Sequence, residues 1–143
     1  MASQAKVPIQ LHVENNGSQT NAELAEICAR SGLNPRHAVH HYAPANVSQE
    51  FTHGLSASVS MGKNSVSSLI DSHENCRSTW TMETDYLDDP NRPGAVLGPK
   101  TVPKRTQALV IQLLEQMNLE ETEEILQHVH SFWPSELYGQ IDP

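Results

Sequence analysis

The chain is short of aromatic residues and of cysteine, and both shortages limit the classes of protein to which it can belong. Aromatic side chains make up 5% of the 143 residues, so a folded core has to be built mainly from Leu, Val, Ile and Ala. The two cysteines, Cys28 and Cys76, are too few for the disulfide framework of a small secreted domain. We therefore expect a single domain in a reducing compartment, either cytoplasmic or part of a particle such as a virion.

Basic residues and long apolar runs are also scarce. Nine Lys and Arg stand against 17 Asp and Glu, and the formal net charge is −8 at pH 7. Such a charge repels phosphate backbones and anionic membrane surfaces, so general affinity for nucleic acid is not expected. No stretch reaches the roughly 18 apolar residues of a membrane-spanning helix, and the N-terminus lacks the apolar core of a secretory signal. Membrane partners are therefore not expected.

Alternation of apolar and polar residues predicts a strand near the N-terminus, followed by a helix. In VPIQLHV, residues 7–13, every second side chain is apolar, which is the period of a half-buried strand. Pro8 lacks an amide hydrogen and so places this strand at a sheet edge. Thr20 and Glu23 then have the spacing of a capping box before an apolar stripe. This pattern predicts a helix over residues 21–31.

The middle of the chain predicts a second helix and then a small sheet. Pro35 suits the first turn of a helix that reaches about Tyr42, so the early part of the chain should form a helical hairpin. The strand LSASVSM is followed by GKN as a hairpin turn into SVSSLI, and RSTWTMETDYL reads as a third strand. The predicted fold class is α+β: a small antiparallel meander plus an N-terminal edge strand, with an early helical hairpin and a C-terminal helical unit.

The last third of the chain is predicted to be helical and separate from the sheet. Proline and glycine gather before RTQALVIQLLEQM, whose apolar residues recur at helical spacing. Asn118 with Glu121 should cap a second helix that Pro134 stops. We therefore divide the chain into an α+β region over residues 1–89, a Pro/Gly-rich connector over 90–103 and a C-terminal helical unit over 104–143.

Three histidines within five residues, His37, His40 and His41, raise the question of a metal site. On the predicted helix, His37 and His41 would present two imidazoles to one ion, and His73 with Cys76 supplies another pair of zinc-ligand type. Neither pair has the tight spacing of a zinc finger, and nothing in the sequence brings the pairs together. We interpret the histidines as capping, hydrogen-bonding or solvent-facing residues, and we expect no metal and no cofactor.

The stretch ELAEICARSGLNPRHAVHHY, residues 23–42, resembles the helix-turn-helix of the tetracycline-repressor family of regulators. In that family a first helix ends near a glycine and the recognition helix closes with an aromatic run. Ile27, Gly32, Leu33 and Tyr42 fall near those places, as do Asn34, His40 and His41. The resemblance implies a small DNA-binding regulator that uses residues 21–42.

Spacing alone identifies no pair of nucleophile and base. GLSAS lacks the second glycine of a nucleophile elbow, and Cys28 lies on the apolar stripe of its helix. DYLDDPN contains Asp85, Asp88 and Asp89 but lacks the downstream glutamate of a calcium loop, which is typical of a solvated turn. The sequence therefore predicts no catalytic residues and no enzymatic activity.

A basic cluster, Lys100, Lys104 and Arg105, lies where the long C-terminal helix should begin. The helix dipole disfavours cations there, so an acidic partner is expected. The acidic start of the next helix, Glu120 to Glu124, could supply it within the chain or from another copy.

The helical unit has more apolar positions than a small sheet can cover, which predicts a protein interface. Its residues are Lys100, Lys104, Arg105, Val110, Leu113, Leu114, Met117, Ile125, Leu126, Val129, Phe132 and Trp133. We therefore predict a non-enzymatic structural protein, a subunit or accessory component of an assembly, whose partners are copies of itself or other subunits. The alternative is the DNA-binding regulator.

Overall fold

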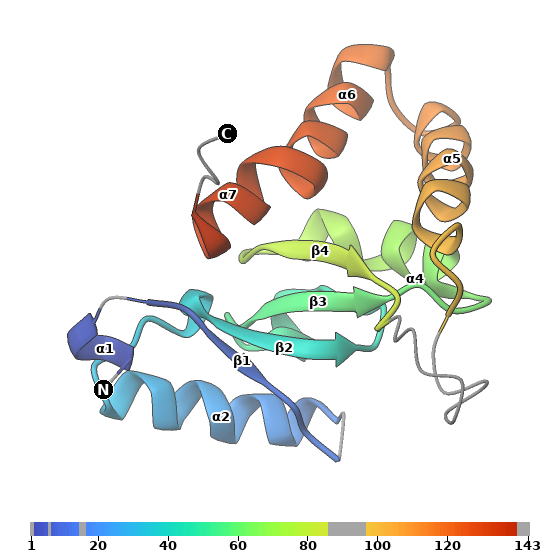
Figure 1. The fold of residues 1–143 in the computed structure, drawn as a ribbon. Helices are drawn as coiled ribbons and strands as arrows, with labels where there is room; N and C mark the ends of the chain where they lie inside the picture. The colour runs from blue at the N-terminus through green and yellow to red at the C-terminus, as the bar shows by residue number, and fades with distance from the viewer. Residues whose placement is uncertain (1, 6, 15–16, 86–96, 140–143) are drawn as a thin grey trace.

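The computed structural model describes residues 2–5, 7–14, 17–85 and 97–139, and its centre is a parallel sheet (Figure 1). The strands are hydrogen-bonded in chain order: β1 (Ile9–Leu11), β2 (Ala38–Ala43), β3 (Ser56–Ser60) and β4 (Trp80–Glu83). Every adjacent pair is parallel. The helices between them are α2 (Ser18–Arg30), α3 (Gln49–Thr52) and α4 (Ser65–Ser72).

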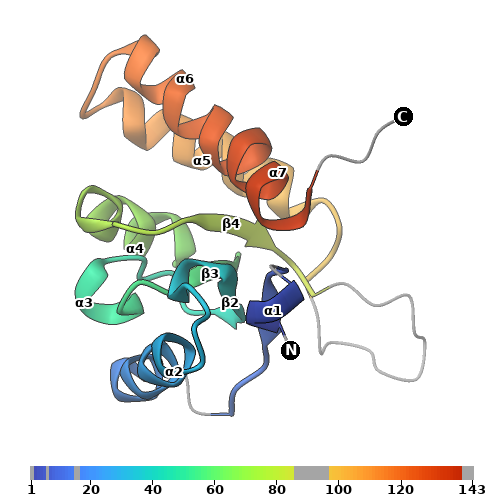
Figure 2. The same cartoon turned by 90° about the vertical axis from the view of Figure 1, so that its left-hand side faces the viewer.

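Helices also precede and follow the sheet. The short α1 (Ala2–Ala5) comes before β1, while the 3₁₀ turns η1 (Pro35–His37) and η2 (His73–Asn75) lead into β2 and toward β4. After β4 come α5 (Thr101–Leu114), α6 (Leu119–Gln127), the π-helical turn η3 (His128–Phe132) and α7 (Trp133–Tyr138). Both views place α5 to α7 beyond β4, on the far side of the sheet from α2 (Figures 1 and 2).

The strand order has a direct consequence for the position of a functional site. Each strand pairs with the next one along the chain, so the crossovers wind in one direction, as they do in an α/β barrel. Parallel strands end at the same edge of their sheet, and the arrowheads of β2, β3 and β4 in Figure 1 point to that edge. Side chains that follow the strands are thereby brought together. We call this side of the sheet the carboxyl edge.

The predicted antiparallel meander is wrong, because the segment read as its second strand is a helix. SVSSLI lies in α4, where Val66 and Leu69 are three residues apart and both buried. A short apolar run fits a buried helix as well as a strand, so its period did not decide between them. With α4 as the crossover, β4 returns parallel to β3.

The predicted early helical hairpin is also wrong in its second half. The helix predicted over 21–31 is confirmed as α2, and Pro35 begins only the single turn η1. Residues 38–43 are then the inner strand β2, in which Ala38, Val39 and His40 are buried. A strand covered on both faces has no polar alternation to mark it. Because no recognition helix exists here, the structure contradicts the resemblance to a helix-turn-helix.

The core is formed by two groups of apolar side chains. One joins α2 to the start of the sheet through Ala25, Cys28, Leu33, Ala38 and Leu55. The other joins the sheet to α4, α5 and η3, and its members include Val59, Leu69, Trp80, Leu109, Leu113 and Val129. Trp80 lies 6.0 Å from Trp133, measured between ring centroids, so the C-terminal helices pack on this chain's own sheet.

The two long helices of the C-terminal unit are confirmed as α5 and α6. The capping box of Asn118 with Glu121 is present at the start of α6. Pro134 does not end the helix, because η3 already interrupts the usual hydrogen-bond ladder and Pro134 lies in the first turn of α7. Glu136 in α7 pairs with Arg36 over 2.7 Å.

Some sequence predictions fall on residues that the structure does not describe. Tyr86 and the connector residues 90–96 lie outside the described ranges, as do residues 140–143. Among the described residues, no helix is both long and apolar enough to cross a membrane.

Packing of α5 on the sheet predicts a large difference between two neighbouring leucines. Leu113 is fully buried and Leu114 is 45% exposed. Leu113→Ala should lower the free energy of unfolding by about 2–5 kcal/mol, because it opens a cavity in the core. Leu114→Ala should change it by about 0.5 kcal/mol or less. Urea unfolding followed by circular dichroism measures both, and equal effects would contradict the packing of α5.

Candidate functional site

The carboxyl edge brings together two imidazoles and two carboxylates from three strands. His12 directly follows β1, His41 lies near the end of β2, Glu83 is the last residue of β4 and Asp85 lies two residues later. We call these four residues the carboxyl-edge cluster. In α/β barrels, catalytic side chains come from this end of the strands.

His41 is the centre of the cluster. Its Nδ1 lies 2.9 Å from Oε2 of Glu83, and its Nε2 lies 3.5 Å from Oδ1 of Asp85. The ring of His12 lies 5.9 Å away, between ring centroids. An imidazole between two carboxylates can hold a proton and pass it on, which is the arrangement that general acid–base catalysis requires.

Glu83 is fixed more firmly than Asp85. One of its carboxylate oxygens faces His41, and the other accepts a hydrogen bond from the backbone N–H of Tyr42. The Glu83 side chain is 16% exposed, whereas that of Asp85 is 38% exposed. Glu83 therefore orients the imidazole, while Asp85 keeps an oxygen open to solvent.

The backbone at the cluster is locally strained. Tyr42 and Asp85 both have positive φ, 56° and 48°, a region in which a residue with a Cβ is costly by about 1–2 kcal/mol. Tyr42 lies in a bulge of β2, where the pairing with β3 shifts between His40 and Ala43. Bulges next to active sites redirect side chains, and strain of this kind gathers at functional sites.

His40, the neighbour of His41, has a structural role behind the cluster. It is buried, and its Nδ1 lies 2.9 Å from Oδ1 of Asn21 in α2. The amide nitrogen of Asn21 donates to the backbone oxygen of Phe51, so Oδ1 is free to accept from His40. Burial lowers the pKa of His40, and the nearby His41 and His12 lower it further. His40 thus joins α2 to the sheet as a neutral imidazole.

The donor types of the cluster are those that bind divalent cations, because imidazole and carboxylate suit Zn²⁺ and related ions. The placement of these donors, however, is not that of a metal site. Within the described ranges, no three or more His, Cys, Asp or Glu are arranged to hold an ion. Both ring nitrogens of His41 face carboxylate oxygens instead of a shared point. We therefore assign no step to a metal.

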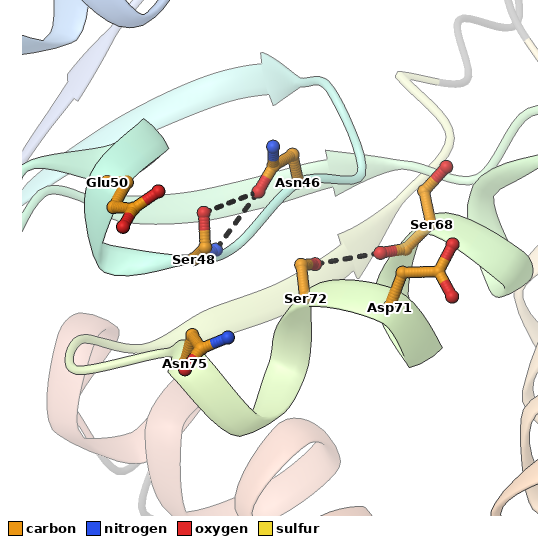
Figure 3. Close-up of a pocket in the computed structure, with 7 residues that line it drawn as sticks. All are labelled: Asn46, Ser48, Glu50, Ser68, Asp71, Ser72 and Asn75. Atoms are coloured by element: carbon orange, nitrogen blue, oxygen red, sulfur yellow. Dashed lines mark hydrogen bonds between the residues drawn. The ribbon is translucent and has the colours of Figure 1, made fainter.

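A separate hollow of about 390 Å³ lies between α3 and α4 (Figure 3). Its lining residues are small or polar: Asn46, Ser48, Glu50, Ser68, Asp71, Ser72 and Asn75. Asn46 accepts hydrogen bonds from the backbone and the hydroxyl of Ser48, and Ser72 donates to the backbone oxygen of Ser68. These bonds hold the loop and the helix in shape, and the lining contains no imidazole or thiol. The hollow is therefore a weaker candidate than the cluster.

The residues considered as metal ligands in the sequence do not converge. His37 lies before β2 and His41 near its end, so the two are separated by about 13 Å of extended chain. His73 lies in η2, and Cys76 follows it near the opposite edge, where its thiol contacts the backbone oxygen of Ser78. Burial lowers the pKa of His73 and raises that of Cys76.

The predicted interface residues fall into four groups. Leu113 and Val129 are buried in the core, and Met117, Ile125, Leu126 and Trp133 pack against it. Val110 is half-buried. Leu114 and Phe132 are largely exposed, at 45% and 55%. The basic cluster begins α5, with Lys100 and Lys104 exposed and Arg105 half-buried. Contact of the exposed residues with another chain stays a prediction.

Sequence reasoning missed the carboxyl-edge cluster. His12 was not predicted as a site residue, and Asp85 was assigned to a solvated turn. Glu83 was predicted to lie on one face of an antiparallel strand. The available signal was that His12, His41 and Glu83 each end or directly follow a short apolar segment. That signal has meaning only if the strands are parallel, because antiparallel strands would place alternate ends at opposite edges.

Comparison with known proteins gives one family and one relative. The family described as "TatD related DNase" matches residues 1–131. The uncharacterized protein MJ1127 of Methanocaldococcus jannaschii is 34% identical over 103 residues, which cover 71% of this chain and 35% of that protein. The chain thus spans about a third of the length of this relative. No solved structure matches the chain significantly.

The family match corrects the function predicted from the sequence. A match over residues 1–131 to a DNase family contradicts a non-enzymatic structural subunit, and with it the assignment to a virion or similar assembly. It equally contradicts the DNA-binding regulator. The absence of a recognisable nucleophile was misleading, because a hydrolase that activates water needs none of its own.

Burial of His40 predicts that the protein loses stability in mild acid. A histidine with a lowered pKa binds its proton less readily in the folded chain than in the unfolded chain, whose pKa is about 6.5. The free energy of unfolding should therefore fall as the pH drops from 7.5 to about 5, with His73 and His130 contributing in the same direction. His40→Gln should make this decline less steep. Urea unfolding at several pH values measures it, and identical slopes would contradict the assignment.

Proposed function

The chain belongs to the TatD-related DNase family, and from this premise we propose that it takes part in the hydrolysis of phosphodiester bonds in DNA. The carboxyl-edge cluster is its catalytic centre. The observation that carries this proposal is the position of His41 between Glu83 and Asp85, at the end of parallel strands. Because the chain covers about a third of its relative, the activity of the whole protein is part of the proposal.

The roles of the carboxylates follow from their exposure and hydrogen bonds. Asp85 is the more exposed, so it accepts a proton from the water that attacks phosphorus. Glu83 has both oxygens engaged, by His41 and by Tyr42 N–H, so it is a positioning residue. Attack by water breaks the P–O bond to the leaving oxygen, which needs a proton in return.

An imidazole is the group that can return this proton. His41 faces both carboxylates, and the ring centroid of the exposed His12 lies 5.9 Å from that of His41. An imidazole has two ring nitrogens, so it can accept a proton at one and donate a proton from the other. His41 donates a proton to the leaving oxygen and takes up from Asp85 the proton that the attacking water gave up.

Two carboxylates beside a phosphodiester also create a problem of charge. Glu83 and Asp85 repel the substrate, and the formal net charge of −8 adds to that repulsion. Productive binding therefore needs positive charge close to the carboxyl edge, to hold the phosphate backbone in place.

Removing the charge of Asp85 should abolish cleavage without unfolding the chain. Asparagine tolerates positive φ, so Asp85→Asn keeps the backbone while it removes the proton acceptor. We expect the rate of cleavage of a labelled DNA oligonucleotide to fall by about a hundredfold or more, and Glu83→Gln to reduce it by a smaller factor. The assay should be run with and without added divalent cations.

Asp71→Asn is the matched control, because Asp71 is exposed on α4 and lines the α3–α4 hollow. It should leave the rate of cleavage unchanged, and circular dichroism should show all three variants folded. Full activity of Asp85→Asn, or loss of activity only in Asp71→Asn, would reject the carboxyl-edge cluster as the catalytic centre.

A further inference from the structure

We propose that Lys100 and Lys104, at the start of α5, bind the phosphodiester backbone of the nucleic acid strand on which the carboxyl-edge cluster acts. The inference rests on the proposed function and names the surface that holds its substrate. It comes from the position of these lysines relative to the cluster, from their lack of an ion pair among the described residues and from the hollow beside them.

A backbone hydrogen bond links the segment before α5 to the carboxyl edge. The N–H of Leu97 donates to the backbone oxygen of Thr84 over 3.1 Å, and Thr84 lies between Glu83 and Asp85. Lys100 follows Leu97 by three residues, so their Cα atoms are at most about 11 Å apart. In Figure 1 the start of α5 lies on the side of the sheet to which the arrowheads point. The start of α5, with Lys100 at its N-cap, therefore lies on the same side of the sheet as the reacting groups.

The acidic residues expected to pair with the lysines lie near the C-terminal end of α5, whereas the lysines lie at its N-terminal end. α5 has 14 residues, a length of about 21 Å, and Glu120 to Glu124 begin α6 beyond its far end (Figure 1). In the part of the chain that the structure describes, no ion pair includes Lys100 or Lys104. The first turn of α5 also lacks an acidic residue.

An anion bound at this point would stabilise the arrangement. Cations at a helix N-terminus oppose the helix dipole, and a nearby negative charge offsets that repulsion. Arg105, the next residue, has a buried Nε with no hydrogen-bond partner among the described residues. Three cationic side chains in six residues thus lack an ion pair within the described ranges, although acids outnumber bases almost two to one in the chain.

The surface around the lysines has room for a strand. A hollow of about 320 Å³ is lined by Gly98, Pro99, Lys100, Thr101 and Lys104. Apart from Gly98 and its two neighbours in the chain, no described residue has a heavy atom within 4 Å of the position that a Cβ on Gly98 would occupy. A phosphodiester backbone supplies repeated negative charge, so one strand can contact both lysines while an adjacent linkage lies at the cluster.

Direct binding measurements test the inference separately from cleavage. The full chain and the double variant Lys100→Ala/Lys104→Ala are titrated into fluorescein-labelled single-stranded and duplex DNA from 50 to 200 mM KCl, and anisotropy is recorded. The double variant should bind roughly tenfold or more weakly at 50 mM, and its slope of log K against log salt should be smaller by about 1.4–1.8.

The control is Arg30→Ala/Arg77→Ala, which removes the same charge at a distance from the carboxyl edge. Arg30 ends α2, where its partner is Glu26 in the same helix, and Arg77 precedes β4. This control should keep the slope of the wild-type chain. Circular dichroism checks that both variants are folded.

Each outcome decides the inference. An unchanged slope in the lysine variant, an equal loss in the arginine control, or no binding by the wild-type chain would overturn it. Cleavage that depends on Asp85 together with binding that ignores the lysines would leave the proposed function standing without this surface. Binding that depends on the lysines without any cleavage would support the surface and reject the proposed function.

Discussion

Parallel pairing of β2 with β1 on one side and β3 on the other is the constraint on which the rest of the structure depends. It forces a crossover between each pair of strands, and α2, α3 and α4 occupy these crossovers. It also places His12, His41 and Glu83 at a single edge, although they are far apart in the sequence. Without this pairing the residues of the cluster would not lie close together.

The inner strands are buried, and the core that covers them holds the strained backbone at their ends in place. Val39, Ala57 and Val59 are almost fully buried, so the core fixes the strands up to the point where the bulge begins. Positive φ at Tyr42 and Asp85 is then tolerated because the surrounding structure determines it. The result is a rigid sheet that presents an exposed carboxylate, Asp85, beside a held imidazole, His41.

Local signals in the sequence predicted α2, α5 and α6, but they missed α4 and the direction of the strands. The stripe of α2 and the capping box of α6 depend on neighbours within a few residues, and both are found in the structure. The direction of β4 depends on whether SVSSLI is a strand or a helix, and six residues with two buried apolar side chains fit both. The cluster could not be predicted, because its members are related only by that direction.

The most direct test of the catalytic edge is to locate where DNA contacts the chain. A short single-stranded oligonucleotide titrated into ¹⁵N-labelled protein, with amide chemical shifts recorded by NMR, reports contacts residue by residue. The structure predicts the largest shifts at His12, Tyr42 and Thr84, around the carboxyl-edge cluster. Shifts confined to Ser48, Ser68 and Asp71, which line the α3–α4 hollow, would contradict it.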